Sequence, residues 1–358
     1  MVGILISIIC TLAIMTAFAA YEGHKRTTTS ANDAQQNGGF ALYELERQVR
    51  TAGSGIVQGN NYSVWGCPLT AYTSSTKVLP ATTQPAPFTA WPTTILAMPI
   101  LASYGGAAAQ PDSIAVISGN PAYQVFKVAV TSTPSVTSIT VGNGFGIQAN
   151  DYLLGVLPGG KCSLAQVTSN PSPYTTITLS SSNSPTTGLN TAVNVFDLGA
   201  QPILTLFGVD TNSNTLVSYD LLQRSAGTNA PSVIPIAEGI ITMKVLYGVH
   251  TGAGGAGEPA DQVDQWVQPT GTWSLATLTA STPAASTAVS NIKAIRIAVV
   301  AQSRLPERST DYVGPPTLTL FSDQPTATQY SIPLNKQYRY RVYDTTIPIR
   351  NSLITNYF

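Results

Sequence analysis

The distribution of apolar and charged residues along the chain predicts a long N-terminal helix. Residues 1–21 carry no charge and are mostly apolar, and residues 1–37 contain no proline. A helix of about 20 apolar residues covers the ~30 Å hydrocarbon layer of a bilayer. The pattern therefore predicts a helix that is long enough to cross a membrane over residues 1–21 and continues beyond it.

Residues 22–52 show the pattern of an amphipathic helix. Apolar residues recur near a period of 3.6, which places them on one face. These residues are Ala41, Leu42, Leu45, Val49 and Ala52, whereas Glu44, Glu46, Arg47 and Arg50 occupy the other faces. The pair Gly38-Gly39 predicts a bend or a local loss of helix, and Gly53 and Gly55 predict its end. We expect the apolar face to pack on the remainder of the chain.

From Gly53 onward the pattern is that of a β-rich protein. Short apolar or alternating segments are separated by clusters of Gly, Pro, Asn and Ser, which is typical of strands and turns. The predicted strands are residues 113–118, 123–130, 138–141, 152–156, 175–179, 192–197, 203–207, 215–222, 240–247, 292–302 and 338–346. Residues 71–87 and 271–290 are rich in Thr, Ser, Pro and Ala and are predicted to be long surface loops. We therefore expect an N-terminal helix over residues 1–52 and a β-rich head over residues 53–358.

The low charge of the chain excludes one class of partner. Charged residues make up 9% of the sequence and the formal net charge is zero, against a typical charged share of about 25%. Binding to nucleic acid requires clustered Lys and Arg to neutralise phosphates, and no such cluster is present. The composition indicates a folded extracellular protein whose solubility comes from uncharged polar groups.

Three cysteines are present, and two of them lie in the predicted head. Cys10 lies within the apolar helix, where a thiol behaves as a small hydrophobic group. In an oxidising compartment Cys67 and Cys162 are expected to form one disulfide; the alternative is two free buried thiols. No CxxC motif occurs, and the two histidines are far apart in sequence. The sequence therefore predicts no metal site of the Cys or His type.

Several segments resemble those of PilW-type minor pilins of the type IV pilus. The first is QNGGFALYELERQVRTA at residues 36–52, followed by Trp65-Gly66-Cys67. Others are residues 147–167, which include NDYLL and KCSLA, and PIAEGIITMKVLYG at residues 235–248. The set is completed by Asp264-Gln265-Trp266, IKAIRIAVVAQS at residues 292–303 and YRYRVYDTTIPIRN at residues 338–351. These segments follow one another in the order of the family.

The resemblance implies a fold and a function. The fold is α+β and type IV pilin-like, with a long N-terminal helix followed by a large β-rich globular head. The expected function is that of a structural subunit, a minor pilin that primes pilus assembly and belongs to a tip complex. Before assembly it would reside in the inner membrane, and afterwards in the extracellular pilus of a Gram-negative-type bacterium. Its partners would be other major and minor pilins, with no cofactor.

The apolar segment is expected to hold the subunit in the membrane and then to pack in the filament core. The side chains assigned to this role are Ile4, Leu5, Ile8, Leu12, Met15 and Phe18. Prepilins of the family carry a basic leader and a glutamate near the cleavage site, and neither motif is found here. We therefore expect this sequence to begin inside the true prepilin.

Residues 250–264 form a second departure from the family. Members often have an Asp- and Gly-rich loop there that resembles a calcium site. Here the acidic residues are Glu258, Asp261 and Asp264, whereas calcium prefers six to eight closely spaced oxygens. The segment is a weak calcium candidate and is expected to be a plain loop. It also reads GAGGAG, but no βαβ pattern surrounds it, so no dinucleotide site is predicted.

Other functions are compatible with parts of the sequence. The chain could be a minor pseudopilin of a type II secretion system or a major filament subunit. The apolar segment could instead be a signal peptide cleaved after Ala17-Phe18-Ala19 or a plain anchor, either of which would suit a surface adhesin. No GxSxG, HExxH or SxxK motif has a plausible setting, and the sequence does not predict an enzyme.

Overall fold

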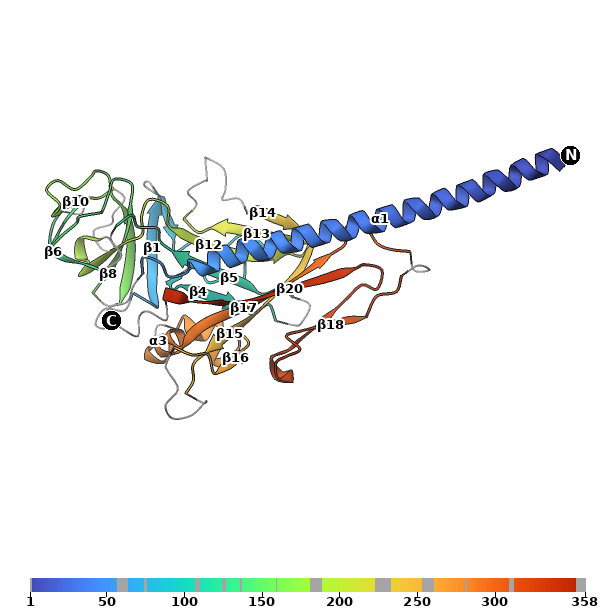
Figure 1. The fold of residues 1–358 in the computed structure, drawn as a ribbon. Coiled ribbons are helices and arrows are strands. Elements are labelled where there is room, and N and C mark those ends of the chain that lie inside the picture. Colours follow the sequence, from blue (N-terminus) through green and yellow to red (C-terminus); the bar gives the residue numbers. More distant parts are fainter. Residues whose placement is uncertain are drawn as a thin grey trace.

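The computed structural model describes most of the chain (Figure 1). The described residues are 2–56, 64–73, 76–106, 110–123, 127–135, 137–158, 160–180, 189–222, 233–252, 261–280, 282–308 and 312–351. One long helix, α1, projects from a head that consists mainly of strands (Figure 1). The expected α+β, pilin-like architecture is confirmed.

Helix α1 spans Val2–Arg50, a length of 49 residues. Its first half extends away from the head, and its second half lies along the head (Figure 1). The chain leaves the helix through Gly53, which has a φ of +78°, a value that glycine adopts without strain. The Gly53 N–H then donates to the Ile117 carbonyl at 2.8 Å, which ties the end of the helix to the head.

The bend predicted at Gly38-Gly39 is wrong, because α1 continues through both residues. The ring of Tyr343 lies directly over Gly38, so that any Cβ at this position would overlap its Cε2 atom. The Tyr343 hydroxyl also donates to the Gln35 carbonyl at 3.0 Å. Gly38 therefore permits a close approach between helix and head, and packing offsets its low helix propensity.

Two sheets form the part of the head that contacts α1. The five-stranded sheet has the order β14 (Ile234–Glu238), β13 (Thr215–Asp220), β12 (Ile203–Asp210), β5 (Ser113–Ser118) and β4 (Ile100–Ser103). The four-stranded sheet has the order β16 (Gln265–Val267), β15 (Ile240–Val249), β17 (Ile292–Gln302) and β20 (Tyr340–Pro348). A hairpin of β18 (Thr317–Leu320) and β19 (Tyr330–Pro333) packs against the four-stranded sheet through a small core of its own.

A third sheet extends to the end of the head opposite the free end of α1 (Figure 1). Its order is β10 (Thr176–Thr178), β7 (Ser138–Val141), β6 (Val128–Ser135), β11 (Asn194–Asp197), β8 (Tyr152–Leu157), β9 (Lys161–Gln166), β1 (Cys67–Thr73) and β2 (Thr76–Leu79), and β3 (Leu96–Ala97) pairs with β1. We call β6 to β11 the distal lobe, because residues between 128 and 195 enclose a separate hydrophobic core there.

Three of the predicted strands have the same bounds in the structure. Residues 113–118, 138–141 and 292–302 coincide with β5, β7 and β17. The strands that were not predicted are β1, β2, β3, β4, β9, β14, β16, β18 and β19, most of which are short or rich in polar residues. Of the residues 71–87 predicted as a loop, part belongs to β1 and β2.

The second predicted loop, residues 271–290, is also wrong. It contains the 3₁₀ helix Gly271–Trp273 and the helices α2 (Leu275–Leu278) and α3 (Pro283–Ser290). Helix α3 begins with Thr282, whose hydroxyl accepts the Ala285 N–H at 3.2 Å, and with proline at its first position. The two further 3₁₀ helices among the described residues are Leu189–Thr191 and Thr326–Thr328.

Candidate assembly site on the N-terminal helix

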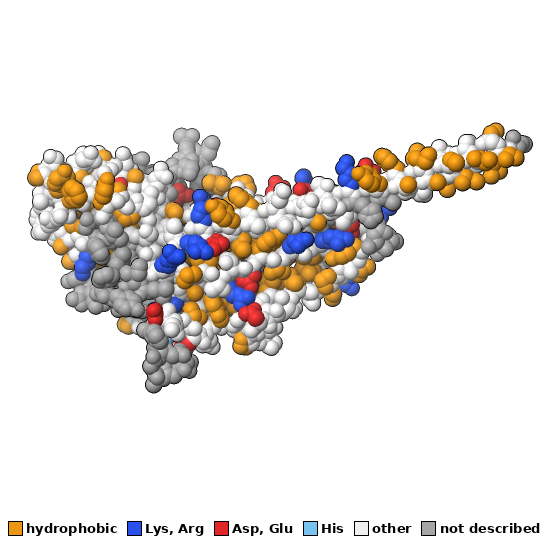
Figure 2. Space-filling model, in the orientation of Figure 1, with side chains coloured by type: hydrophobic (Ala, Val, Ile, Leu, Met, Phe, Trp, Pro, Cys, Tyr) orange, Lys and Arg blue, Asp and Glu red, His pale blue; other side chains and the backbone are white. Residues whose placement is uncertain are grey.

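The first half of α1 exposes large apolar side chains on all sides. Each of the residues assigned from the sequence is more than half exposed, from 59% for Ile8 to 69% for Met15. The six are Ile4, Leu5, Ile8, Leu12, Met15 and Phe18. Orange side chains cover this part of the helix almost continuously (Figure 2). Such a surface is unfavourable in water and suits a lipid bilayer or a bundle of similar helices.

Three hydroxyl groups in this half of α1 form hydrogen bonds within the helix. The Ser7 hydroxyl donates to the Ile4 carbonyl at 2.9 Å, and the Thr16 hydroxyl donates to the Ala13 carbonyl at 2.9 Å. The Thr11 hydroxyl bonds to carbonyls of the preceding turn in the same way. Because each hydroxyl has a partner on its own helix, the segment can enter a dry environment without leaving them unbonded.

The second half of α1 packs on the head through a single face. Ala41, Leu45, Val49 and Ala52 are fully buried in the main core, and Leu42 packs at its edge. The amphipathic pattern of the sequence is thus confirmed. Glu44 and Glu46 form ion pairs on the helix surface with Arg47 and Arg50, respectively.

Polar contacts fix the part of α1 that follows its apolar half. The Thr27 hydroxyl donates to Glu307 at 2.9 Å, and the Ser30 hydroxyl accepts the Leu305 N–H at 3.2 Å. At the other end, Asn351 donates to the Ala52 carbonyl at 2.7 Å. The helix is therefore held to the head along most of its second half.

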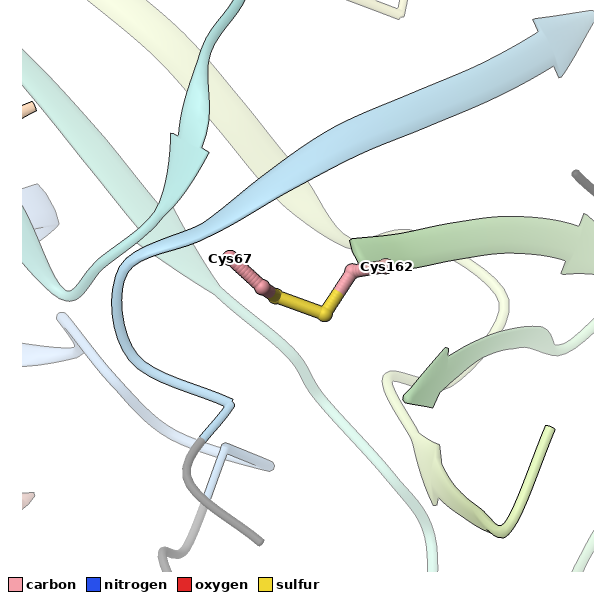
Figure 3. Close-up of a disulfide and its surroundings, with 2 residues drawn as sticks. All are labelled: Cys67 and Cys162. Carbon is pink, nitrogen blue, oxygen red and sulfur yellow. A yellow bond between two sulfur atoms is a disulfide. The ribbon is translucent and has the colours of Figure 1, made fainter. Parts of the chain in front are cut away.

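A disulfide joins Cys67 at the start of β1 to Cys162 in β9 (Figure 3). The two Cα atoms lie 5.6 Å apart, and both side chains are buried. Strands β1 and β9 also pair in parallel, with Leu69 opposite Cys162. The disulfide and this pairing connect the first strand after α1 to the distal lobe.

The described residues contain no cluster of acidic side chains that could hold a metal ion around the calcium candidates Asp261 and Asp264. Asp264 accepts the Thr251 N–H at 2.8 Å and the Thr251 hydroxyl at 3.2 Å, and it lies 3.8 Å from a ring nitrogen of His250. Its oxygens thus close the base of the loop. Glu258 and most of the GAGGAG segment lie outside the described residues, so the calcium expectation stays untested.

One family model matches the part of the head that lies under α1. Residues 206–351 match the model of the family described as PilW, Type IV Pilus-assembly protein W. We call these matched residues the PilW region. No curated protein and no solved structure matches the chain.

The PilW region supplies most of the surface on which α1 lies. It contains β13 to β20, and with them Tyr343 over Gly38, Leu305 beside Ser30 and Glu307 beside Thr27. The apolar half of α1, the disulfide and the distal lobe lie outside the matched residues. The chain thus joins a long helix with an apolar first half to a region that matches the PilW family model.

A buried ion pair that the sequence did not predict connects the PilW region to the residue before β5. Lys244 of β15 lies 3.2 Å from Asp112, and both side chains are fully buried. The ammonium lies 4.7 Å from the ring centre of Tyr330 and 5.5 Å from that of Tyr104, within cation–π range. Burial raises the pKa of Asp112 and lowers that of Lys244, and each charge opposes the shift of the other. No motif signals this pair, because its members are distant in sequence.

A second buried carboxyl group lies where the distal lobe joins β12. Oδ1 of Asp197 accepts the Gly199 N–H at 2.8 Å, whereas Oδ2 has no hydrogen-bond partner among the described residues. Burial raises the pKa of Asp197 to about 7, and the nearby Asp151 adds to the shift. The group therefore changes charge near neutral pH.

Asp197 is expected to make the protein less stable as the pH rises. Its folded pKa of about 7 lies above the unfolded value near 3.8, so the folded state holds the proton more tightly and this advantage is lost as the pH rises through 7. Linkage gives a loss of about 2–3 kcal/mol between roughly pH 5 and pH 8. Urea unfolding of the full chain in detergent would measure the free energy of unfolding at each pH. Relative to the wild type, that of Asp197→Asn should increase by this amount between pH 5 and pH 8. A constant difference between the two proteins would contradict the assignment.

Proposed function

We propose that the chain is a minor pilin of the type IV pilus that primes assembly and takes part in a complex at the fibre tip. The observation that carries this proposal is the continuity of α1, which extends from an exposed apolar half directly onto the PilW region. The role is structural, since the described site offers apolar surface and rigid packing. Its partners are other pilins, major and minor, and the inner membrane before assembly.

The proposed mechanism depends on two environments for one helix. While the subunit is in the inner membrane, the apolar half of α1 contacts the acyl chains of the lipids. On assembly, the same side chains pack among the equivalent helices of neighbouring subunits. The second half of α1 cannot move separately from the head, because contacts at Ser30, at Gly38 and at Ala52 just beyond its end hold it there. Extraction of the helix therefore moves the whole head.

The position of the distal lobe supports a place at the tip. A membrane helix fixes the direction of the subunit, and the distal lobe lies at the end of the head farthest from the free end of α1 (Figure 1). In a fibre it would point away from the membrane, toward the next subunit above. A subunit at the tip has no such neighbour and leaves the lobe unobstructed.

Replacement of Leu12 by aspartate is expected to prevent insertion of the protein into the membrane. The cells should then also assemble few pili. Leu12 lies near the middle of the apolar segment and is 67% exposed. A carboxylate at the centre of a membrane helix costs about 3 kcal/mol, which corresponds to a loss of roughly 100-fold in insertion. Leu12→Met is the matched control, because it keeps an apolar side chain of similar size. Both variants would be expressed in a deletion strain, and membrane fractions and sheared pili would be quantified.

The same strain distinguishes a minor tip subunit from a major one. We expect few pili without the protein, and immunogold label at fibre ends when it is restored. Normal piliation of the deletion strain, or label along the whole fibre in stoichiometric amounts, would overturn the proposal.

A further inference from the structure

Three exposed aromatic rings form a cluster on loops beside strands of the distal lobe. Tyr123, Phe145 and Tyr174 are 68%, 58% and 57% exposed. The ring centre of Phe145 lies 6.5 Å from that of Tyr123 and 5.4 Å from that of Tyr174. We call these three residues the aromatic cluster. Large apolar side chains that remain exposed and adjacent to one another commonly mark an interaction site.

Backbone N–H groups of the loop that carries Phe145 form hydrogen bonds that hold the loop in place. The Phe145 N–H donates to Oδ1 of Asn143 at 2.9 Å, and the Gly144 N–H donates to the Tyr174 carbonyl at 2.6 Å. A Cβ on Gly144 would lie 2.8 Å from that carbonyl oxygen, and Gly146 has a φ of +98°. A glycine on each side therefore allows the tight turn that presents Phe145 beside Tyr174. The ring of Phe145 is exposed because this turn directs it away from the protein core.

The surroundings of the aromatic cluster are polar and almost uncharged. Between Tyr123 and Asp197 the charged residues are Lys127, Asp151 and Lys161, and Asp151 is buried. Figure 2 shows apolar and uncharged polar atoms with few charged side chains over the visible face of the lobe. This part of the chain therefore offers few charged groups for ion pairing with a ligand.

Amide groups beside the rings are available as hydrogen-bond donors. Asn143 and Asn170 are both exposed, and each uses its Oδ1 within the protein, Asn170 by accepting the Ala149 N–H at 2.7 Å. Their Nδ2 groups have no hydrogen-bond partner among the described residues, and each carries two N–H donors. Gln148 and Thr175 add further exposed polar groups on the same loops.

We propose that the aromatic cluster is a binding site for neutral oligosaccharides. Pyranose rings combine an apolar face of C–H groups with hydroxyl groups at the edge. The C–H face is attracted to the negative face of an aromatic ring, and the hydroxyls can accept from the amides of Asn143 and Asn170. Sites for small ligands commonly combine aromatic surface with a few polar groups in this way. An uncharged sugar suits a surface with few charged groups better than a sialylated or sulfated sugar does.

The site is separate from the surfaces that the helix and the PilW region use. Tyr123, Phe145 and Tyr174 all precede residue 206, where the PilW match begins, and α1 contacts chiefly β20, β17 and β14. Sugar binding therefore does not depend on the proposed place of the subunit in the fibre, and it can be tested on the isolated full-length chain.

The test is a glycan array probed with the full chain in a detergent that has no sugar headgroup. The array carries neutral, sialylated and sulfated oligosaccharides. Phe145→Ser and Tyr174→Ser remove rings from the aromatic cluster. Phe40→Ser is the matched control, since Phe40 is 52% exposed on α1 and lies outside the cluster. Equal melting temperatures of the four proteins would show that the substitutions leave the fold intact.

We expect the wild type and Phe40→Ser to bind neutral oligosaccharides, and both cluster variants to bind them at least tenfold more weakly. Absence of binding by the wild type, or binding restricted to anionic sugars, would overturn the proposal. It would also be overturned if Phe145→Ser and Tyr174→Ser bound as well as the wild type.

Discussion

Replacement of Lys244 by methionine is expected to destabilise the head by about 3–5 kcal/mol, the usual cost of removing one partner from a buried ion pair. The carboxyl group of Asp112 would remain fully buried with the N–H groups of Gly105 and Val245 at 2.9 and 3.0 Å and no cation beside it. Its pKa, already raised by burial, would rise further. Chemical denaturation of the full chain in detergent, followed by tryptophan fluorescence, would measure the loss.

A double variant separates the cost of an unpaired charge from the cost of altered packing. In Lys244→Met with Asp112→Asn both charges are absent, and the oxygen of the introduced amide can still accept a backbone N–H. We expect the double variant to recover most of the stability lost by Lys244→Met alone, because replacing both partners is often close to neutral. If the double variant were as unstable as the single one, the ion pair would not be the source of the effect.

Removal of the disulfide through Cys67→Ala with Cys162→Ala is expected to cost about 4–5 kcal/mol, because in the chain-entropy model a crosslink over a loop of this length restricts the unfolded state by roughly that amount. The two cysteines are 95 residues apart in sequence. Unfolding of the wild type in the presence of a reductant should reproduce the loss. Denaturant midpoints of oxidised, reduced and variant protein provide the comparison.

Cys10→Ser supplies the control for the disulfide. Cys10 is a free thiol on the exposed half of α1, so its replacement should leave the stability of the head unchanged. Equal stability of the double alanine variant and the oxidised wild type would show that the crosslink contributes nothing.

The helix and the long strands were predictable because each carries a periodic signal over many residues. Ala41, Leu45 and Val49 define one helical face, and β17 is an uninterrupted run of mostly apolar residues. The prediction failed at Gly38 because the local propensity of a glycine pair opposes a helix, whereas the deciding contact comes from Tyr343, distant in sequence. Helix α3 was not predicted although its capping signal, Thr282 followed by Pro283, is present. There the Ala- and Thr-rich composition was interpreted as a loop, although the capping residues indicate the start of a helix.

Features that depend on tertiary contacts have no local pattern in the sequence. Lys244 and Asp112 are 132 residues apart, and neither lies in a motif that indicates the other. The aromatic cluster likewise draws one ring from each of three separate loops. The assignment of apolar residues such as Ile8 and Leu12 to a membrane or filament helix depends only on composition and length, and it stays a prediction.

The crosslink between β1 and β9 has a mechanical consequence. In the fibre that we propose, tension would pull on the helix against whatever the distal end of the head had bound. The covalent path from α1 reaches the distal lobe through Cys67 and Cys162 without passing along the strands between them (Figure 3). The parallel pairing of β1 with β9 places a ladder of hydrogen bonds beside that path. The crosslink would thus carry load directly from the start of β1 to β9, through a bond that does not yield by unfolding.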